Sequence, residues 1–194
     1  MRKLYVIVFV SLAAAALVGC GGGSEASESS PATNSASAVP FDQAFIDAMV
    51  PHHRSAIAMA KAANTRGLST PELAKIADDI ITSQQKEIDQ MLAWREQWFG
   101  SRKLGPVLSE VLGVPEADLG MEHGGPDEIL ESVDPETTFA EMMLPHHEGA
   151  VAMAENAREG AQHARVKTLA ENIVAAQKRE IEILEKHAGG TMEH

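Results

Sequence analysis

An internal repeat is the feature that most constrains the fold of this chain. The segment Phe45–Ala60 recurs as Phe139–Ala154, with a constant offset of 94 residues and no gap. A second pair of matching segments, Ile76–Ile88 and Leu169–Ile181, follows at an offset of 93 residues. Matching blocks in the same order predict two copies of one structural unit, and such units bury their apolar faces against each other.

Helical patterning divides each copy into two helices. Apolar residues recur at helical spacing in the second block, as in Ile76, Ile80 and Ile88. Ser69-Thr70-Pro71-Glu72 supplies an N-cap, a proline in the first turn and a capping-box glutamate, and Asp134-Pro135-Glu136 does the same. We therefore predict helices over residues 42–66, 71–99, 135–159 and 164–187.

The composition favours an all-α protein. Aromatic residues make up 4% of the chain whereas the hydrophobic set reaches 44%, so Ala, Leu, Ile, Val and Met supply most of the apolar content. Strands favour aromatic and β-branched residues, while Ala, Leu and Met favour helices. Because each predicted hairpin leaves one apolar stripe uncovered, we expect the two duplicated helical hairpins to pair into a four-helix bundle.

These elements define one folded domain over residues 41–190. It consists of a first hairpin over 41–100, a linker over 101–133 and a second hairpin over 134–190. The linker contains several Gly and Pro residues, and short helical turns are predicted at 106–112 and 127–132. Connections this long are often functional.

The N-terminus has the pattern of a secretion signal. A positive segment, Met1–Lys3, precedes an apolar run that is short for a membrane span and ends at Val18-Gly19-Cys20. It resembles a bacterial lipoprotein signal, in which cleavage leaves the cysteine as the lipid-bearing first residue; an ordinary secretory signal is the alternative. We predict a signal peptide over 1–19, a flexible tether over 20–40 from lipidated Cys20, and an extracytoplasmic location in a bacterial cell envelope, anchored to the inner or the outer membrane.

Charge and cysteine content exclude several function classes. The chain has 16 Lys and Arg against 28 Asp and Glu, a formal net charge of −12, whereas nucleic-acid binding needs a basic face. A single cysteine excludes an internal disulfide framework and a Cys-rich zinc or iron–sulfur site. No nucleic-acid partner is therefore expected, and the protein partner is left open.

A Pro-His-His motif lies inside the first helix of each copy, at Pro51 and at Pro145. A proline in a helix interior removes one backbone hydrogen bond and bends the helix. A tolerated kink is the simpler interpretation, but a kink beside two histidines that occurs twice favours a metal site at the bend. An internal network of these histidines with Glu87 and Glu180 is the alternative, because a buried carboxylate needs a partner.

Methionines flank the histidines on the same helical faces. Thioether and imidazole together suit copper, since soft sulfur selects Cu(I) and imidazole binds both Cu(I) and Cu(II). Imidazole with carboxylate alone fits zinc or iron as well. The candidate metal ligands are His52, His53, His146, His147, Met49, Met143, Met59, Met153, Glu87 and Glu180.

Further Met and His residues lie outside the paired motifs. Met121-Glu122-His123 is in the linker, and Met192-Glu193-His194 closes the chain. Both are flanked by glycine and are candidate accessory metal-capturing segments, although coincidental polar segments are equally expected. Met91, whose counterpart in the second copy is Leu184, is a further candidate.

The paired F-x-x-x-M-x-P-H-H-x-x-A-[IV]-x-M-A blocks, each followed by a Gln-x-x-Glu-Ile helix, resemble the DUF305 family. The resemblance covers about residues 41–187 and implies a ferritin-like four-helix architecture. The family includes periplasmic copper-binding proteins of the CopM type, so the resemblance also implies extracytoplasmic copper handling. The matching motif positions are Met49, His52, His53, Glu87, Met143, His146, His147 and Glu180.

The leading hypothesis is a lipid-anchored protein that binds copper and so buffers or sequesters it outside the cytoplasm, without enzymatic activity. One alternative is a ferritin-like redox enzyme with a dinuclear iron or manganese centre, although the Glu-x-x-His pattern of such sites is absent from the chain. Another is a helical interaction module in which the histidines only form hydrogen bonds within the core.

Overall fold

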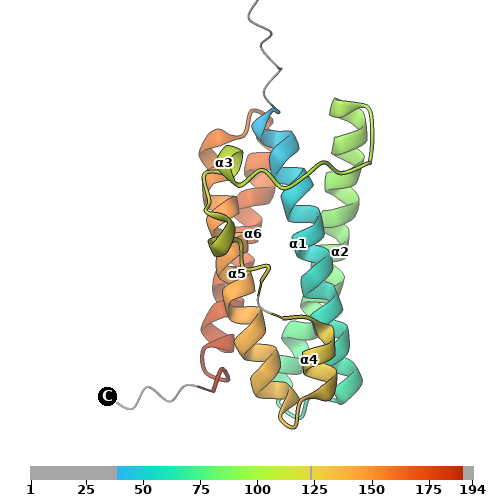
Figure 1. The fold of residues 1–194 in the computed structure, drawn as a ribbon, viewed down its shortest axis with the longest axis vertical. Coiled ribbons are helices and arrows are strands. Elements are labelled where there is room, and N and C mark those ends of the chain that lie inside the picture. Colours follow the sequence, from blue (N-terminus) through green and yellow to red (C-terminus); the bar gives the residue numbers. More distant parts are fainter. Residues whose placement is uncertain (1–38, 123, 190–194) are drawn as a thin grey trace, which may run out of the picture. The chain divides into compact units, whose positions relative to one another are not determined.

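The computed structural model describes residues 39–122 and 124–189, which are helical with no strand among them (Figure 1). The long helices are α1 (Phe41–Arg66), α2 (Pro71–Phe99), α5 (Pro135–Gly160) and α6 (Ala164–Leu184). The linker carries α3 (Ser109–Leu112), the 3-10 helix η1 (Glu116–Leu119) and α4 (Pro126–Glu131). The predicted all-α class is confirmed for this part of the chain.

The predicted signal peptide, Cys20, most of the tether, His123, Met192 and His194 lie outside the described residues. Among the residues that are described, no helix has the length and apolarity needed to cross a membrane.

The four long helices pack as two hairpins. Helices α1 and α2 contact each other extensively, as do α5 and α6, and α1 and α5 join the hairpins. Helices α2 and α6 have far fewer contacts with each other. Both α1–α5 and α2–α6 are antiparallel (Figure 1). The linker lies along α1 and α5, so it covers one face of the helical assembly.

The helix limits agree closely with the prediction, with two differences. Helix α6 ends at Leu184, which is buried, and the chain continues as a turn in which Glu185 and Lys186 are exposed. The 3-10 helix η1 was not predicted, since four residues between Pro115 and Gly120 carry no helical periodicity.

The start of α2 differs from the sequence-based expectation. Glu72 does not complete a capping box, and Thr70 makes no side-chain cap. Instead Glu136 of α5 accepts hydrogen bonds from Ser69 Oγ at 2.7 Å, from Thr70 N at 3.0 Å and from Thr70 Oγ1 at 2.6 Å. The prediction was wrong because a carboxylate from the other hairpin occupies the position from which Glu72 would have accepted hydrogen bonds at the start of α2.

The equivalent acid of the first copy makes the reciprocal contact. Asp42 is buried and accepts hydrogen bonds from Gln162 N at 3.0 Å and from His163 N at 3.1 Å, at the start of α6. Asp42 and Glu136 are related by the same offset of 94 residues as the rest of the first block. Each hairpin therefore caps the second helix of the other hairpin, which sets how the two copies are placed.

We expect Glu136→Gln to lower the free energy of unfolding by about 1 kcal/mol at pH 7, because one acceptor oxygen and the charge are lost from the α2 cap. Hydrogen bonds from Thr70 and Ser69 lower the pKa of Glu136 to about 2. A carboxyl with a lowered pKa stabilises the fold above its unfolded pKa, near 4.5, and this stability is lost as the pH falls toward 2. The difference between wild type and variant should thus shrink below pH 4.5 in urea denaturation. Glu72→Gln is the control, and an equal loss for that variant would contradict this assignment.

Candidate metal centre

The two Pro-His-His motifs meet where α1 and α5 pack together. His52, His53 and His147 are 0% exposed and His146 is 2% exposed. The imidazole rings of His52 and His146 lie with their centroids 3.8 Å apart, at an interplanar angle of 43°. The structure thus brings together histidines that are 94 residues apart in the sequence.

In each hairpin, a carboxylate of the second helix forms a hydrogen bond with one histidine of the first helix. His53 Nε2 lies 2.7 Å from Glu87 Oε2, and His147 Nε2 lies 2.7 Å from Glu180 Oε2. The histidines are fully buried, whereas the side chains of Glu87 and Glu180 are 20% and 16% exposed. The two pairs are equivalent under the repeat, and each joins the two helices of one hairpin.

These bonds orient the imidazole rings. A carboxylate can only accept, so Nε2 of His53 and of His147 carries the hydrogen. In the neutral ring Nδ1 then holds a lone pair, and Nδ1 of both residues is buried without a hydrogen-bond partner. A carboxylate on one ring nitrogen and a free lone pair on the other is the arrangement by which proteins orient histidines for metal binding.

The linker orients His52 in the same way, with Nε2 bonded and Nδ1 without a partner. Its Nε2 donates to the carbonyl oxygen of Leu119 at 3.0 Å, and its buried Nδ1 has no hydrogen-bond partner. The pKa of His52 is lowered to about 3, mainly by burial and to a smaller extent by the nearby His53 and His147. His52 is therefore neutral at physiological pH, which is the form that ligates a metal.

Two glycines allow the linker backbone to approach α5 this closely. A Cβ on Gly149 would lie 2.2 Å from the Leu119 carbonyl oxygen, and a Cβ on Gly120 would lie 2.3 Å from the Pro145 carbonyl oxygen. Gly120 also has a positive φ of 71°. The sequence signal for this contact was the replacement of Ser55 in the first copy by Gly149 in the second.

Two buried glutamines complete the polar groups, and neither is among the candidate ligands expected from the sequence. Gln84 and Gln177 are each 3% exposed, and the amide Oε1 of each has no hydrogen-bond partner. Each lies three residues before the carboxylate of its helix, on the same helical face. Their signal was the Gln-x-x-Glu-Ile motif itself, in which only the glutamate was interpreted.

The glutamines lie at the same level of the antiparallel helices α2 and α6. Ser83 and Lys86 of α2 line one cavity together with Ala176 and Arg179 of α6, so positions 84 and 177 are opposite each other. We call the following set the central polar layer: His52, His53, His146, His147, Gln84, Gln177, and the carboxylates of Glu87 and Glu180 at its edge.

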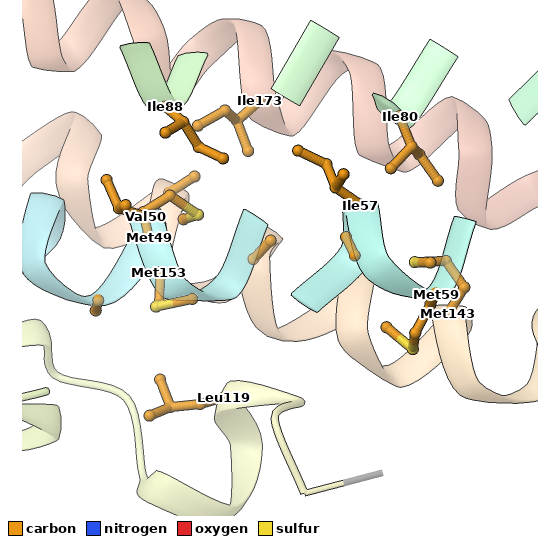
Figure 2. Close-up of a cluster of buried hydrophobic side chains, with 14 of the residues drawn as sticks. Met49, Val50, Ile57, Met59, Ile80, Ile88, Leu119, Met143, Met153 and Ile173 are labelled. Carbon is orange, nitrogen blue, oxygen red and sulfur yellow. The ribbon is translucent and has the colours of Figure 1, made fainter. Parts of the chain in front are cut away.

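Four of the predicted methionines flank the histidines. Met49, Met143 and Met153 are 0% exposed and Met59 is 1% exposed. Met49 is next to Met153, and Met59 is next to Met143, in the view of Figure 2. Met49 precedes the histidines along α1 and Met59 follows them. One thioether pair therefore lies before the central polar layer and the other lies after it along the axis of α1.

Two of the accessory candidates, Met91 and Met121, lie among the described residues. Met91 is buried in the hydrophobic core, and Met121 is 37% exposed in the linker. Over residues 39–122 and 124–189, no three His, Cys, Asp or Glu side chains are grouped as metal ligands. In this structure the histidine–carboxylate pairs therefore stay as two separate pairs.

The central polar layer has an excess of hydrogen-bond acceptors. Nδ1 of His52, His53 and His147 and Oε1 of Gln84 and Gln177 are buried and unpartnered. Buried acceptors without donors are costly, and such groups normally bind an ion or ordered water. Lone pairs of imidazole between pairs of thioethers form a donor set for a soft or borderline cation.

One protein family matches most of the chain. The profile described as "Domain of unknown function (DUF305)" matches residues 22–95 and 42–188. A search of curated proteins found no significant match.

Several solved structures have a similar fold. The chain is 32% identical to CopM in its Cu(I)-bound form, with a TM-score of 0.62, covering 75% of this chain and 93% of CopM. For the Cu(II)-bound form of CopM the identity is 29% and the TM-score 0.60, covering 76% and 95%. A DUF305 protein from Streptomyces coelicolor is similar in fold, with 22% identity and a TM-score of 0.63, covering 75% and 90%.

We expect Gly149→Ala to lower the free energy of unfolding by about 2 kcal/mol, because the new methyl group displaces the Leu119 carbonyl from α5 and weakens its bond to His52. Alanine favours helices over glycine, so propensity alone predicts the opposite sign. Urea denaturation measures the difference. The matched control is Ser55→Ala at the equivalent position of α1, which should be neutral; a stabilised Gly149→Ala protein would contradict the close linker contact.

Proposed function

The chain belongs to the DUF305 family, and on that premise we propose that it binds copper in the central polar layer and so buffers or sequesters the metal outside the cytoplasm. The observation that carries this proposal is the duplicated pair of buried histidines. In His53 and His147, one histidine of each pair, Nε2 is bonded to a carboxylate and Nδ1 is unpartnered. The similarity to CopM, solved with Cu(I) and with Cu(II) bound, supports copper over other metals.

The proposed ligands are the imidazole nitrogens of the layer and the thioethers of Met49, Met59, Met143 and Met153. Thioethers favour Cu(I), while imidazoles accept both oxidation states. Glu87 and Glu180 hold and orient the histidines from outside, a role that raises the basicity of the ligating nitrogen. Because the two histidine–carboxylate pairs are separate, metal binding draws side chains of the two hairpins together.

Binding and release are sufficient for this function, and no chemical step is required of the protein. The histidines must be neutral to ligate, so copper affinity falls in acid as protons compete with the metal for the imidazole nitrogens. Zinc, iron and manganese remain weaker candidates for the same imidazole and carboxylate groups. A dinuclear iron or manganese redox site uses these two donor types as well, and the repeat-related histidine–carboxylate pairs are the observation that keeps this alternative. The ferritin-like classification also remains a prediction.

We expect purified protein to bind Cu(I) and Cu(II) and to gain thermal stability on loading, because a ligand that binds only the folded state stabilises it. Changing His52, His53, His146 and His147 together to Ala should abolish binding in a competition titration against a chromophoric chelator. His187→Ala, which removes a histidine outside the layer, is the control and should bind as wild type.

A second variant that preserves the core keeps the test valid if the histidine mutant does not fold. Met→Leu changes at positions 49, 59, 143 and 153 conserve volume and apolarity. They should weaken Cu(I) binding at least tenfold while changing Cu(II) binding less, since only Cu(I) strongly prefers thioether. Unaltered binding in both variants would refute copper binding in the layer. Recovery of iron with oxygen consumption would instead favour the redox enzyme.

We also propose that the protein is held at the extracytoplasmic side of a membrane by lipid on Cys20, with residues 20–40 as the tether. The support is the N-terminal sequence alone. Cys20→Ala should move the protein from the membrane fraction to the soluble fraction, and mass spectrometry of the N-terminal peptide should detect the lipid in wild type. A soluble wild-type protein without lipid would contradict the anchor.

A further inference from the structure

A metal ion needs a path to the central polar layer, because its four histidines are at most 2% exposed. Helices α1 and α2, and likewise α5 and α6, are tightly packed within each hairpin, which leaves the two faces between the hairpins as candidates for this path. One side is formed by α1 and α5 under the linker, and the other is formed by α2 and α6. The structure differs sharply between these two sides.

The α1–α5 side is closed by the linker backbone. The carbonyl of Leu119 is bonded to His52 Nε2 at 3.0 Å. Gly120 and Gly149 are in such close contact with the opposite backbone that neither has space for a Cβ. The Leu119 side chain is itself buried, at 3% exposure. An ion arriving here would have to displace the segment from the core.

The α2–α6 side has a solvent-exposed depression instead. This shallow cavity, of about 420 Å³, lies between the two helices and is lined by Ser83, Lys86 and Glu87 of α2 and by Ala176, Arg179 and Glu180 of α6. Ser83 and Ala176 are small, and these two helices have few contacts with each other. The gap is therefore a consequence of small side chains at the seam between the hairpins.

The carboxylates in this cavity connect it to the buried histidines. Glu87 and Glu180 are partly exposed to solvent, and their Oε2 atoms bond His53 and His147, which are fully buried. Asp79 also lines the cavity, so three carboxylates face the two cations Lys86 and Arg179. On the inner side, the unpartnered amide oxygens of Gln84 and Gln177 lie one helical turn from the two glutamates.

We propose that the metal ion enters and leaves the central polar layer through the α2–α6 cavity, with Glu87 and Glu180 as the first protein ligands that it meets. This inference rests on the proposed copper binding. A carboxylate that pairs with the cation releases the Nε2–H of its histidine, and the imidazole ring can then turn to present the lone pair of Nδ1 to the ion. The two glutamates thus have a role in exchange as well as in orientation, and Gln84 and Gln177 offer oxygen ligands on the way inward.

The test narrows the cavity without touching a proposed ligand. Ala176→Phe places an aromatic ring in the α2–α6 opening. Ala152→Phe is the matched control, since Ala152 is a similarly half-buried alanine that lines a hollow on the linker side, beside Gly120 and Pro145. Each protein is loaded with Cu(I), an excess of a chromophoric Cu(I) chelator is added, and the rate of colour formation is measured together with the copper stoichiometry at equilibrium.

We expect Ala176→Phe to release copper about tenfold more slowly than wild type, equivalent to about 1.4 kcal/mol in the barrier, at unchanged stoichiometry. Ala152→Phe should release it at the wild-type rate. Ser83→Phe is a second variant on an exposed position of the same cavity and should also be slow, which keeps the test valid if Ala176→Phe is unstable.

Two results would overturn the route. One is wild-type release rates in both cavity variants, and the other is slower release in Ala152→Phe alone, which would place the path under the linker. Failure of wild-type protein to bind copper at all would instead refute the proposed function, so the two failures are distinguishable.

Discussion

The structure depends on burying four histidines where α1 and α5 meet. Imidazole groups in an apolar core are costly unless they are hydrogen-bonded. The protein meets this cost with Glu87, Glu180 and the Leu119 carbonyl, each of which accepts a hydrogen bond from one Nε2–H. These three bonds determine which helices must be adjacent, and they leave the lone pairs of three imidazoles inside the protein.

Duplication explains much of the remaining architecture. The capping acids Asp42 and Glu136, the histidine–carboxylate pairs and the buried glutamines all occur once per copy at equivalent positions. The copies nevertheless differ where the linker backbone packs directly against α5. Gly149 replaces Ser55 because the linker backbone occupies the space that a side chain would need. Other differences, such as Arg54 against Glu148 and Met91 against Leu184, show that the halves are not interchangeable.

The two faces beside the central polar layer differ in how closely they are packed. Backbone contacts close the linker side, whereas small residues and a loose helix seam leave a polar cavity on the other side. The same glutamates orient the histidines and border this cavity. The proposed route through this cavity suits reversible binding of an ion better than permanent retention, because the ion would not have to displace the linker backbone.

The sequence by itself determined the helical class, the four long helices, the duplication and the histidines and glutamates of the layer. Each of these follows from local periodicity or from a repeated motif. Only the tertiary structure decided which nitrogen of His53 and His147 faces the carboxylate, that Glu136 caps the other hairpin, and that Gln84 and Gln177 are opposite each other. It also decided that η1 covers His52. The physical reason is that these contacts join residues far apart in the chain, so their geometry depends on how the helices pack and has no local signature.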